Sequence, residues 1–271
     1  MMIDAPPVLD TPPALHYEVA GEGEAVVLLN GGMMSSFAWQ PIATELEKSH
    51  RVVRLDFRGQ LRSPAPPPPD LAGHAADVVR VLDALGIEKA HLVGTSFGAL
   101  VGLVVAADHP DRVSSLLAMT VTVRMSPEMD AGTRRLRALA QETLAGGDGG
   151  KILDAVVPAT YSPEWIAANE ATLALRRVQV AALPRAWFSG LDGLLGALEG
   201  VDLTGRLARI RAPTVVVAAE RDLTFPLPNS EELVRGIAGA RLVKVPGAPH
   251  GFVLEQPAAA LAIIREALAA P

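Results

Sequence analysis

The stretch GTSFG sets one serine between two glycines, a spacing that suits a reactive hydroxyl. Ser96 lies between Gly94 and Gly98, after an apolar run and before a segment with helical character. In a strand–turn–helix context, Gly-x-Ser-x-Gly forms a strained turn that places the serine hydroxyl above the edge of the sheet. The alternative is an ordinary small residue at a glycine-rich helix start, which this context disfavours. The pattern therefore predicts that Ser96 is a nucleophile.

A serine hydroxyl needs a base to take its proton, and the chain contains six histidines. His250 lies in VPGAPHGFVLEQP, directly after the last apolar run, and Asp222 follows the preceding run in TVVVAAERDLTFP. Glu220 is the rival acid, two residues before Asp222. The chain order serine, aspartate, histidine is the one in which such a triad is built on a mostly parallel sheet. We predict structural or surface roles for the other five histidines, which are His16, His50, His74, His91 and His109.

Acyl chemistry also requires hydrogen-bond donors for the oxyanion of the tetrahedral intermediate. We predict that the backbone N–H of Phe97, the residue after the nucleophile, is one donor. The loop LLNGGMMSSFAWQP should supply the other, with Gly32 as the best position, because glycine lets backbone approach a substrate closely. An ordinary strand-ending turn is the alternative for this loop.

Residues near these positions are candidates for a substrate pocket that would bind an apolar acyl group. For each large side chain the competing interpretation is a place in the hydrophobic core. No metal site is expected, because the histidines are scattered and no His-Glu-x-x-His spacing occurs. The pocket candidates are Asn30, Gly31, Met33, Met34, Phe37, Trp39, Trp187 and Phe188.

Six apolar, β-branched runs alternate with helix-like segments, which indicates an α/β fold with a mostly parallel sheet covered on both faces. LHYEVAG near the start should add an antiparallel edge. Asp70 and Gly86 are suited to begin and end one of the helices. Because parallel strands share one carboxyl edge, the loops that carry Ser96 and His250 should meet there. The six runs are 25–30, 51–57, 90–95, 114–120, 214–220 and 240–245.

The alternation stops between Arg124 and Arg209, where helix signals replace strands. This segment is predicted to be a helical insertion whose inner face lines an apolar pocket and whose other apolar residues form a small core. Two of its helices start with Ser followed by Pro, a favourable pair at a helix N-terminus. Its helices are predicted over 126–147, 162–183 and 183–200, with GGDGG at 146–150 as a loop.

Composition restricts the class of protein. The 271 residues include no cysteine and carry a formal net charge of −6 at pH 7. Disulfides, thiolate nucleophiles and cysteine-ligated metals are therefore excluded, and nucleic acid is an unfavourable partner for an acidic chain. No apolar run reaches the roughly 18 residues of a membrane span, and the N-terminus lacks the pattern of an export signal. We expect a cytoplasmic protein that acts on a small molecule, without a membrane partner.

Taken in order, these motifs resemble the α/β-hydrolase superfamily over nearly the whole chain. LLNGGMMSS is similar to the oxyanion loop, LDFRGQLRSPAP to the Asp-x-Arg-Gly-x-Gly-x-Ser stretch, LVGTSFGAL to the nucleophile elbow, AAERDLTFP to the acid loop and GAPHGFVLEQP to the histidine loop. The resemblance implies a core of about eight strands over 1–123 and 210–271, a helical cap over 124–209, and no cofactor. Asn30 and Leu61 depart from the family pattern, which usually has His and Gly there.

The expected function is hydrolysis of a carboxylic ester of a small or medium apolar acyl group, through an acyl-Ser96 intermediate. The oxyanion loop is also locally similar to acyltransferases that join 3-hydroxyacyl chains, so transfer of the acyl group to a hydroxyl acceptor is the first alternative. Lactone, thioester and carbon–carbon bond cleavage could use the same residues. A ligand receptor without catalysis is disfavoured, because all three triad residues are present.

Overall fold

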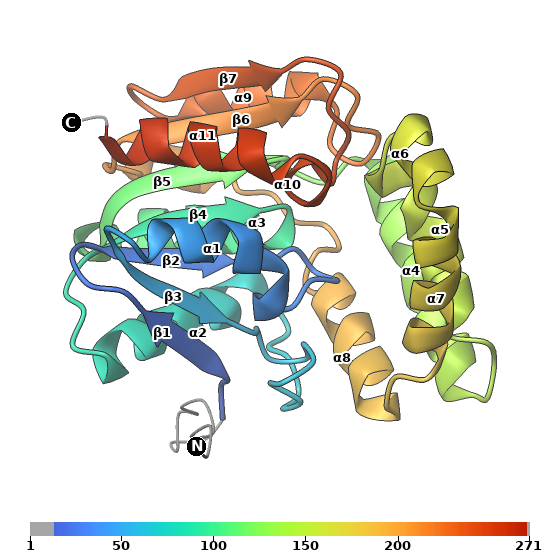
Figure 1. Cartoon of the computed structure of the whole chain (residues 1–271). Helices are drawn as coiled ribbons and strands as arrows, with labels where there is room; N and C mark the ends of the chain where they lie inside the picture. Colours follow the sequence, from blue (N-terminus) through green and yellow to red (C-terminus); the bar gives the residue numbers. More distant parts are fainter. Residues whose placement is uncertain (1–13, 270–271) are drawn as a thin grey trace.

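Seven strands form one sheet, in the order β1-β3-β2-β4-β5-β6-β7, in the computed structural model, which describes residues 14–269 (Figure 1). β1 pairs with β3 in antiparallel orientation and all other pairs are parallel. The six predicted runs and the antiparallel edge are confirmed. The strands are β1 (Tyr17–Ala20), β2 (Ala25–Leu29), β3 (Arg51–Leu55), β4 (Ala90–Thr95), β5 (Val113–Met119), β6 (Thr214–Ala219) and β7 (Arg241–Val245).

The expected count of about eight strands is one too high for the described residues. A single antiparallel strand, β1, precedes β2, and only four residues separate the two. The chain passes between them through Gly21, whose φ is +78°. This glycine has no room for a side chain, because a Cβ there would lie 2.2 Å from the carbonyl oxygen of His50. The antiparallel part of the sheet is therefore one strand wide.

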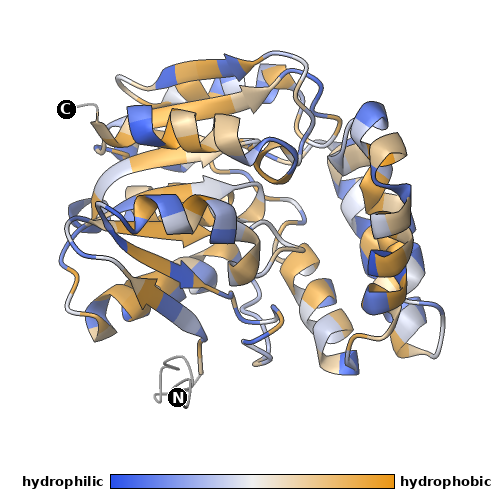
Figure 2. Cartoon of the chain, viewed as in Figure 1, coloured by the Kyte–Doolittle hydropathy of each residue, from blue (hydrophilic) through white to orange (hydrophobic). Residues whose placement is uncertain are grey.

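Helices cover both faces of the sheet, as continuous apolar strands require. The five residues of β2 and the six of β6 are all buried, and Figure 2 shows apolar residues along the central strands. α1 and α11 lie on one face, and α2, α3 and α9 lie on the other (Figure 1). The bounds of these helices are α1 (Gln40–Leu46), α2 (Leu71–Ala84), α3 (Phe97–Asp108), α9 (Leu227–Gly236) and α11 (Pro257–Ala269).

The ends of α2 follow the predicted signals. Asp70 is the N-cap, and its Oδ1 accepts a hydrogen bond of 2.9 Å from the backbone N–H of Gly73. The helix ends at Ala84, and Gly86 follows with a φ of +63°. A residue without Cβ adopts that left-handed conformation at little cost.

Five helices occupy the segment between β5 and β6 and lie beyond the carboxyl ends of the parallel strands (Figure 1). Ser126 and Ser162 cap α4 and α6 as predicted, accepting hydrogen bonds from the backbone N–H groups of Met129 and Trp165. The assignment of core to 1–123 and 210–271 and of cap to 124–209 remains a proposal. The five helices are α4 (Pro127–Leu144), α5 (Gly150–Thr160), α6 (Pro163–Ala168), α7 (Glu170–Ala181) and α8 (Arg185–Gly196).

Two details of this segment differ from the prediction. The helix expected over 162–183 is two helices, because Asn169 leaves the helical conformation with φ −124° and ψ 20°. Its side-chain Nδ2 donates to the carbonyl oxygen of Trp165, while its backbone N–H donates to that of Ile166. The second difference is α5, which was not predicted and which begins at Gly150, at the end of the expected GGDGG loop.

Short helical turns complete the described part of the chain, namely η1 (Ser36–Trp39), η2 (Pro110–Arg112), η3 (Thr204–Arg209) and α10 (Phe252–Glu255). No helix within residues 14–269 has both the length and the apolar character that crossing a membrane requires.

Candidate active site

Ser96 forms the turn between β4 and α3 in a strained conformation, with φ 52° and ψ −118°. The two flanking glycines are required by space. A Cβ at Gly94 would lie 2.7 Å from the backbone nitrogen of Ala99, and a Cβ at Gly98 would lie 2.3 Å from the carbonyl oxygen of Leu29. The packing of strand, turn and helix therefore explains the Gly-x-Ser-x-Gly spacing, and it maintains a non-glycine residue at positive φ.

His250 and Asp222 meet Ser96 at the carboxyl edge of the sheet. His250 Nε2 lies 3.1 Å from Ser96 Oγ, and His250 Nδ1 lies 2.8 Å from Asp222 Oδ2. Asp222 is buried, and its other oxygen, Oδ1, accepts 2.8 Å hydrogen bonds from the backbone N–H groups of Thr224 and Phe225. These bonds fix the carboxylate while it orients the imidazole. The three residues thus form a continuous chain of hydrogen bonds from aspartate to serine.

Glu220, the rival acid, lies apart from the imidazole. It is exposed, and its Oε2 accepts a hydrogen bond of 3.0 Å from the backbone N–H of Gly247. It therefore supports the turn after β7, while Asp222 contacts His250.

The five other histidines lie outside this constellation. His16 and His91 contact Glu18 and Glu24, and His50 lies 2.9 Å from Ser49 Oγ. His109 is the C-cap of α3, and His74 is buried in α2. Within residues 14–269 the histidines and carboxylates form no group of three or more that could hold a metal ion.

The oxyanion loop lies directly against the elbow. A Cβ built on Gly31 would lie 3.8 Å from Ser96 Cβ, and one on Gly32 would lie 3.8 Å from Phe97 Cβ. Gly32 and Phe97 both line the cavity that contains Ser96. The two residues thus lie side by side at the cavity wall, and their role as oxyanion donors is a proposal.

A cavity of about 1250 Å³ opens above Ser96 and His250. Its walls come from the oxyanion loop, from the loop that follows Asp222, and from α4, α5, α7 and α8. Of the predicted lining residues, Gly31, Met33, Met34 and Trp187 contribute to it. The cavity therefore lies between the sheet edge and the helices of 124–209.

Four of the predicted pocket residues do not line this cavity. Asn30 and Trp39 are fully buried, and Trp39 Nε1 donates to Asn30 Oδ1 over 3.0 Å. Phe37 is 68% exposed on η1 and is not among the residues that line the cavity. Phe188 is 2% exposed and packs edge-on against Trp187 within the core. Proximity in sequence to Gly32 or Trp187 was therefore a poor guide to which side chains face the cavity.

Most of the side chains from residues 124–209 that line the cavity were not predicted. On α4 and just before it, Met125, Met129, Leu136 and Leu139 recur at helical spacing, a pattern that marks one apolar face. Tyr161 also lines the cavity and stacks on Trp165 with ring centroids 4.1 Å apart, and burial raises its pKa. The periodicity could have identified the α4 residues, whereas nothing in the local sequence distinguishes Tyr161.

Known proteins match this chain in sequence and in structure. The family model described as alpha/beta hydrolase fold matches residues 24–146. Two relatives bear the name carbamate hydrolase RutD: one from Azorhizobium caulinodans is 32% identical over 88% of each chain, and one from Variovorax paradoxus is 35% identical over 90% of this chain and 92% of the relative.

Solved structures agree with this match. The enol-lactonase from Burkholderia xenovorans superimposes with a TM-score of 0.86 at 27% identity, covering 97% of this chain and all of the other. An alpha/beta hydrolase enzyme from a Medee basin deep-sea metagenome library has a TM-score of 0.90 at 23% identity and covers 98% of both chains. The second likeness concerns the fold alone.

Proposed function

The chain belongs to the α/β-hydrolase superfamily and is a hydrolase, and we propose that it cleaves a carboxylic ester of a small or medium apolar acyl group through an acyl-Ser96 intermediate. The observation that carries this proposal is the hydrogen-bonded series Asp222, His250, Ser96 at the base of the cavity. Such a series makes a serine hydroxyl nucleophilic near neutral pH.

In the first half of the proposed reaction, His250 Nε2 takes the proton from Ser96 Oγ as Oγ attacks the ester carbonyl carbon. Asp222 accepts the hydrogen bond from Nδ1–H and stabilises the imidazolium that forms. The backbone N–H groups of Gly32 and Phe97 donate to the oxyanion of the tetrahedral intermediate. The C–O bond to the alcohol then breaks, and His250 returns its proton to the leaving oxygen.

In the second half, water enters where the alcohol has left. His250 takes a proton from that water, which attacks the acyl carbon, and the same two N–H groups bind the second oxyanion. Collapse of this intermediate breaks the bond to Ser96 Oγ, which recovers the proton from His250. The products are a carboxylic acid and the regenerated enzyme.

The cavity supports an apolar acyl group. Met33, Met129, Leu136, Val180 and Trp187 are among its lining residues, and burying an apolar chain against such side chains stabilises a complex by roughly 0.8 kcal/mol per methylene. A small polar carbamate, the substrate that the names of the two relatives suggest, would fill only a small part of about 1250 Å³. A lactone is an ester within a ring and would react by the same steps, as the enol-lactonase neighbour suggests.

The proposal predicts steady hydrolysis of p-nitrophenyl esters by the purified protein. The series should run from acetate to decanoate, with Ser96→Ala as the inactive variant and Ser49→Ala, an exposed serine, as the matched control. We expect activity to rise with chain length to a maximum set by the cavity, to be lost in Ser96→Ala and to be retained in Ser49→Ala.

Addition of a 3-hydroxy fatty acid separates hydrolysis from acyl transfer. A burst without turnover, relieved by the hydroxy acid with formation of a new ester, would replace this proposal by the acyltransferase alternative. Full activity in Ser96→Ala would contradict both.

A further inference from the structure

Gln60 lies behind the oxyanion loop and is 2% exposed. Its Nε2 donates to the carbonyl oxygens of Gly31, over 2.8 Å, and of Gly32, over 3.3 Å. Its Oε1 accepts 2.9 Å hydrogen bonds from the backbone N–H of Phe57 and from Asn30 Nδ2. Both donors face the oxygen and both acceptors face the nitrogen, so the network allows one orientation of the amide.

We infer that Gln60 is a positioning residue that aims the Gly32 N–H at the oxyanion, an inference that rests on the proposed function. The Gly31 carbonyl and the Gly32 N–H belong to one peptide unit, which is planar and trans, so they point in opposite directions. Gln60 holds the carbonyl on the side away from the cavity. The N–H of the same unit is thereby directed toward the side on which Gly32 lines the cavity beside Phe97.

This loop needs such an anchor because two consecutive glycines have no side chains of their own to restrain them. One other bond holds the same carbonyl, since the backbone N–H of Met34 donates to Gly31 O over 3.0 Å. Loss of the Gln60 bonds should therefore loosen the peptide unit without releasing the loop. The expected loss of rate is accordingly smaller than the 10²- to 10³-fold that removal of a whole oxyanion donor causes.

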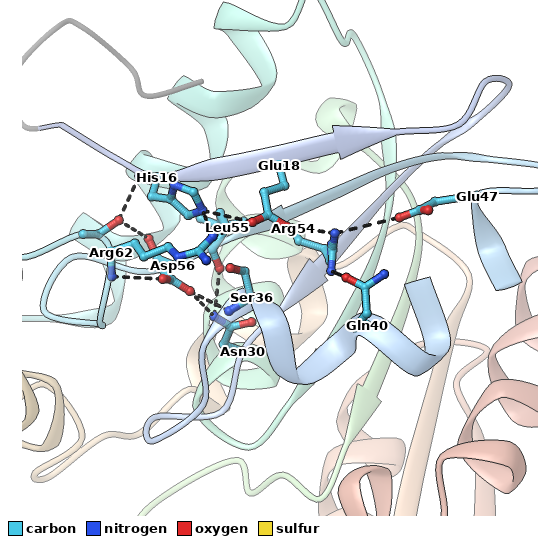
Figure 3. A network of polar contacts seen from close by, with 11 residues as sticks. His16, Glu18, Asn30, Ser36, Gln40, Glu47, Arg54, Leu55, Asp56 and Arg62 are labelled. Carbon is cyan, nitrogen blue, oxygen red and sulfur yellow. Dashed lines mark hydrogen bonds and ion pairs between the residues drawn. The ribbon is translucent and has the colours of Figure 1, made fainter. Parts of the chain in front are cut away.

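A second layer of buried groups holds Gln60 and the loop together. Asn30 Nδ2 donates to the Leu55 carbonyl over 2.8 Å and to Asp56 Oδ1 over 3.2 Å (Figure 3). The same Nδ2 also donates to Gln60 Oε1. Asp56 Oδ1 accepts from the Ser36 N–H over 2.6 Å, and its Oδ2 accepts from the Arg62 N–H over 3.1 Å. Asp56 thus connects the end of the oxyanion loop to the turn that carries Gln60. Asn30, where the family usually has histidine, therefore helps to hold Gln60 and the oxyanion loop in place.

The test compares two replacements of Gln60 with a control in p-nitrophenyl ester hydrolysis. Gln60→Met keeps the length and removes every hydrogen bond, and we expect a 10- to 100-fold lower kcat with KM changed less than threefold. Gln60→Glu keeps the shape but replaces the donor by an oxygen that donates only when protonated. Gln40→Met is the control, because Gln40 bonds to Arg54 and Thr44 without contact to the glycines, and it should retain wild-type kcat.

A pH series supplies the readout that a purely structural role would not change. The ratio of kcat for Gln60→Glu to kcat for wild type should rise as the pH falls, because the protonated carboxyl can donate to Gly31 O. The same ratio for Gln60→Met should stay flat. Thermal midpoints measured in parallel show which of the variants are folded.

A folded Gln60→Met variant with wild-type kcat would overturn the inference, as would a loss that appears only in KM or a flat ratio for Gln60→Glu. These outcomes differ from failure of the proposed function, in which the wild-type protein itself would not turn over the esters. If Gln60→Met does not fold, the pH dependence of Gln60→Glu decides alone.

Discussion

At the scale of single residues, the site depends on which polar atoms face each other. Asp222 uses one oxygen for His250 and the other for two backbone N–H groups. Both carboxylate oxygens of Asp222 therefore accept hydrogen bonds, and the imidazole of His250 has one favourable orientation. Glu220 is only two residues away, yet it bonds to a different loop. The carboxylates of Asp222 and Glu220 bond to different loops, and neither the side-chain type nor the spacing in the sequence reveals this difference.

Replacing Asp222 by asparagine should lower kcat by about 10³- to 10⁴-fold, because an amide favours the wrong imidazole tautomer and cannot stabilise the imidazolium. The matched variant Glu220→Gln should keep kcat within about twofold. Ester hydrolysis with saturating substrate checks both. A large loss in Glu220→Gln together with little loss in Asp222→Asn would reverse the assignment.

At the scale of elements, two contacts attach the 124–209 helices to the catalytic loops. Glu255 in α10 accepts hydrogen bonds from the N–H and hydroxyl of Ser162, the N-cap of α6. The Gly251 N–H, next to His250, donates to the Thr160 carbonyl over 2.7 Å. These bonds connect the α5–α6 corner to the histidine loop, so displacement of the helices would disturb the base.

The other contact is a direct approach of backbone to backbone. A Cβ on Gly190, in α8, would lie 2.1 Å from the carbonyl oxygen of Gly59. Gly59 precedes Gln60, and Trp187 and Leu195 of α8 line the cavity. α8 therefore packs against the turn whose Gln60 side chain bonds to the oxyanion loop.

We expect Gly190→Ala to lower the free energy of unfolding by about 1–3 kcal/mol, the usual cost of overpacking, and to raise KM because the cavity wall moves. Gly132→Ala in α4 is the matched control, since no heavy atom lies within 4 Å of its added Cβ. There the better helix propensity of alanine should stabilise the protein by roughly 0.5–1 kcal/mol. Urea titration of both variants measures the change in stability, and ester kinetics of Gly190→Ala measure the change in KM; equal stability of the two variants would contradict the close contact.

At the scale of the whole molecule, one buried histidine should govern part of the stability toward acid. His74 is fully buried against Phe57 and Phe97, and neither of its ring nitrogens has a hydrogen-bond partner. Burial, assisted by the positive charge of Arg58, lowers the pKa of His74 to about 3 from the ordinary 6.5. Between pH 6.5 and 3, His74 therefore binds a proton in the unfolded chain but remains neutral in the folded protein.

Because the folded pKa is depressed, stability should fall as the pH drops below about 6.5, by up to about 1.4 kcal/mol per pH unit from this residue. Substitution of His74 by leucine should remove this part of the slope in urea titrations between pH 4.5 and 7.5. Phe57→Leu in the same cluster is the control, since it alters packing but keeps the histidine. Equal slopes in wild type and His74→Leu would show that the ring is protonated or solvated in the folded state.

The sequence alone was sufficient to predict the strands of the sheet and the residues that meet at its carboxyl edge. Buried parallel strands require long apolar, β-branched runs, and those runs were recognisable without any long-range information. Their positions along the chain placed Ser96, Asp222 and His250 after β4, β6 and β7, and the carboxyl ends of these parallel strands meet at one edge. The Gly94 and Gly98 spacing was readable because a steric requirement restricts those positions to one residue type.

Only the tertiary structure decided which side chains face the cavity and which support it. Phe37 and Met33 belong to the same loop and are both apolar, yet the first is exposed and the second lines the site. The bonds from Gln60 to Gly31 and Gly32 join residues 29 and 28 positions apart. An amide side chain carries no periodic pattern, and its partners are set by the packing of distant backbone. Such directional contacts arise only when the whole chain is folded.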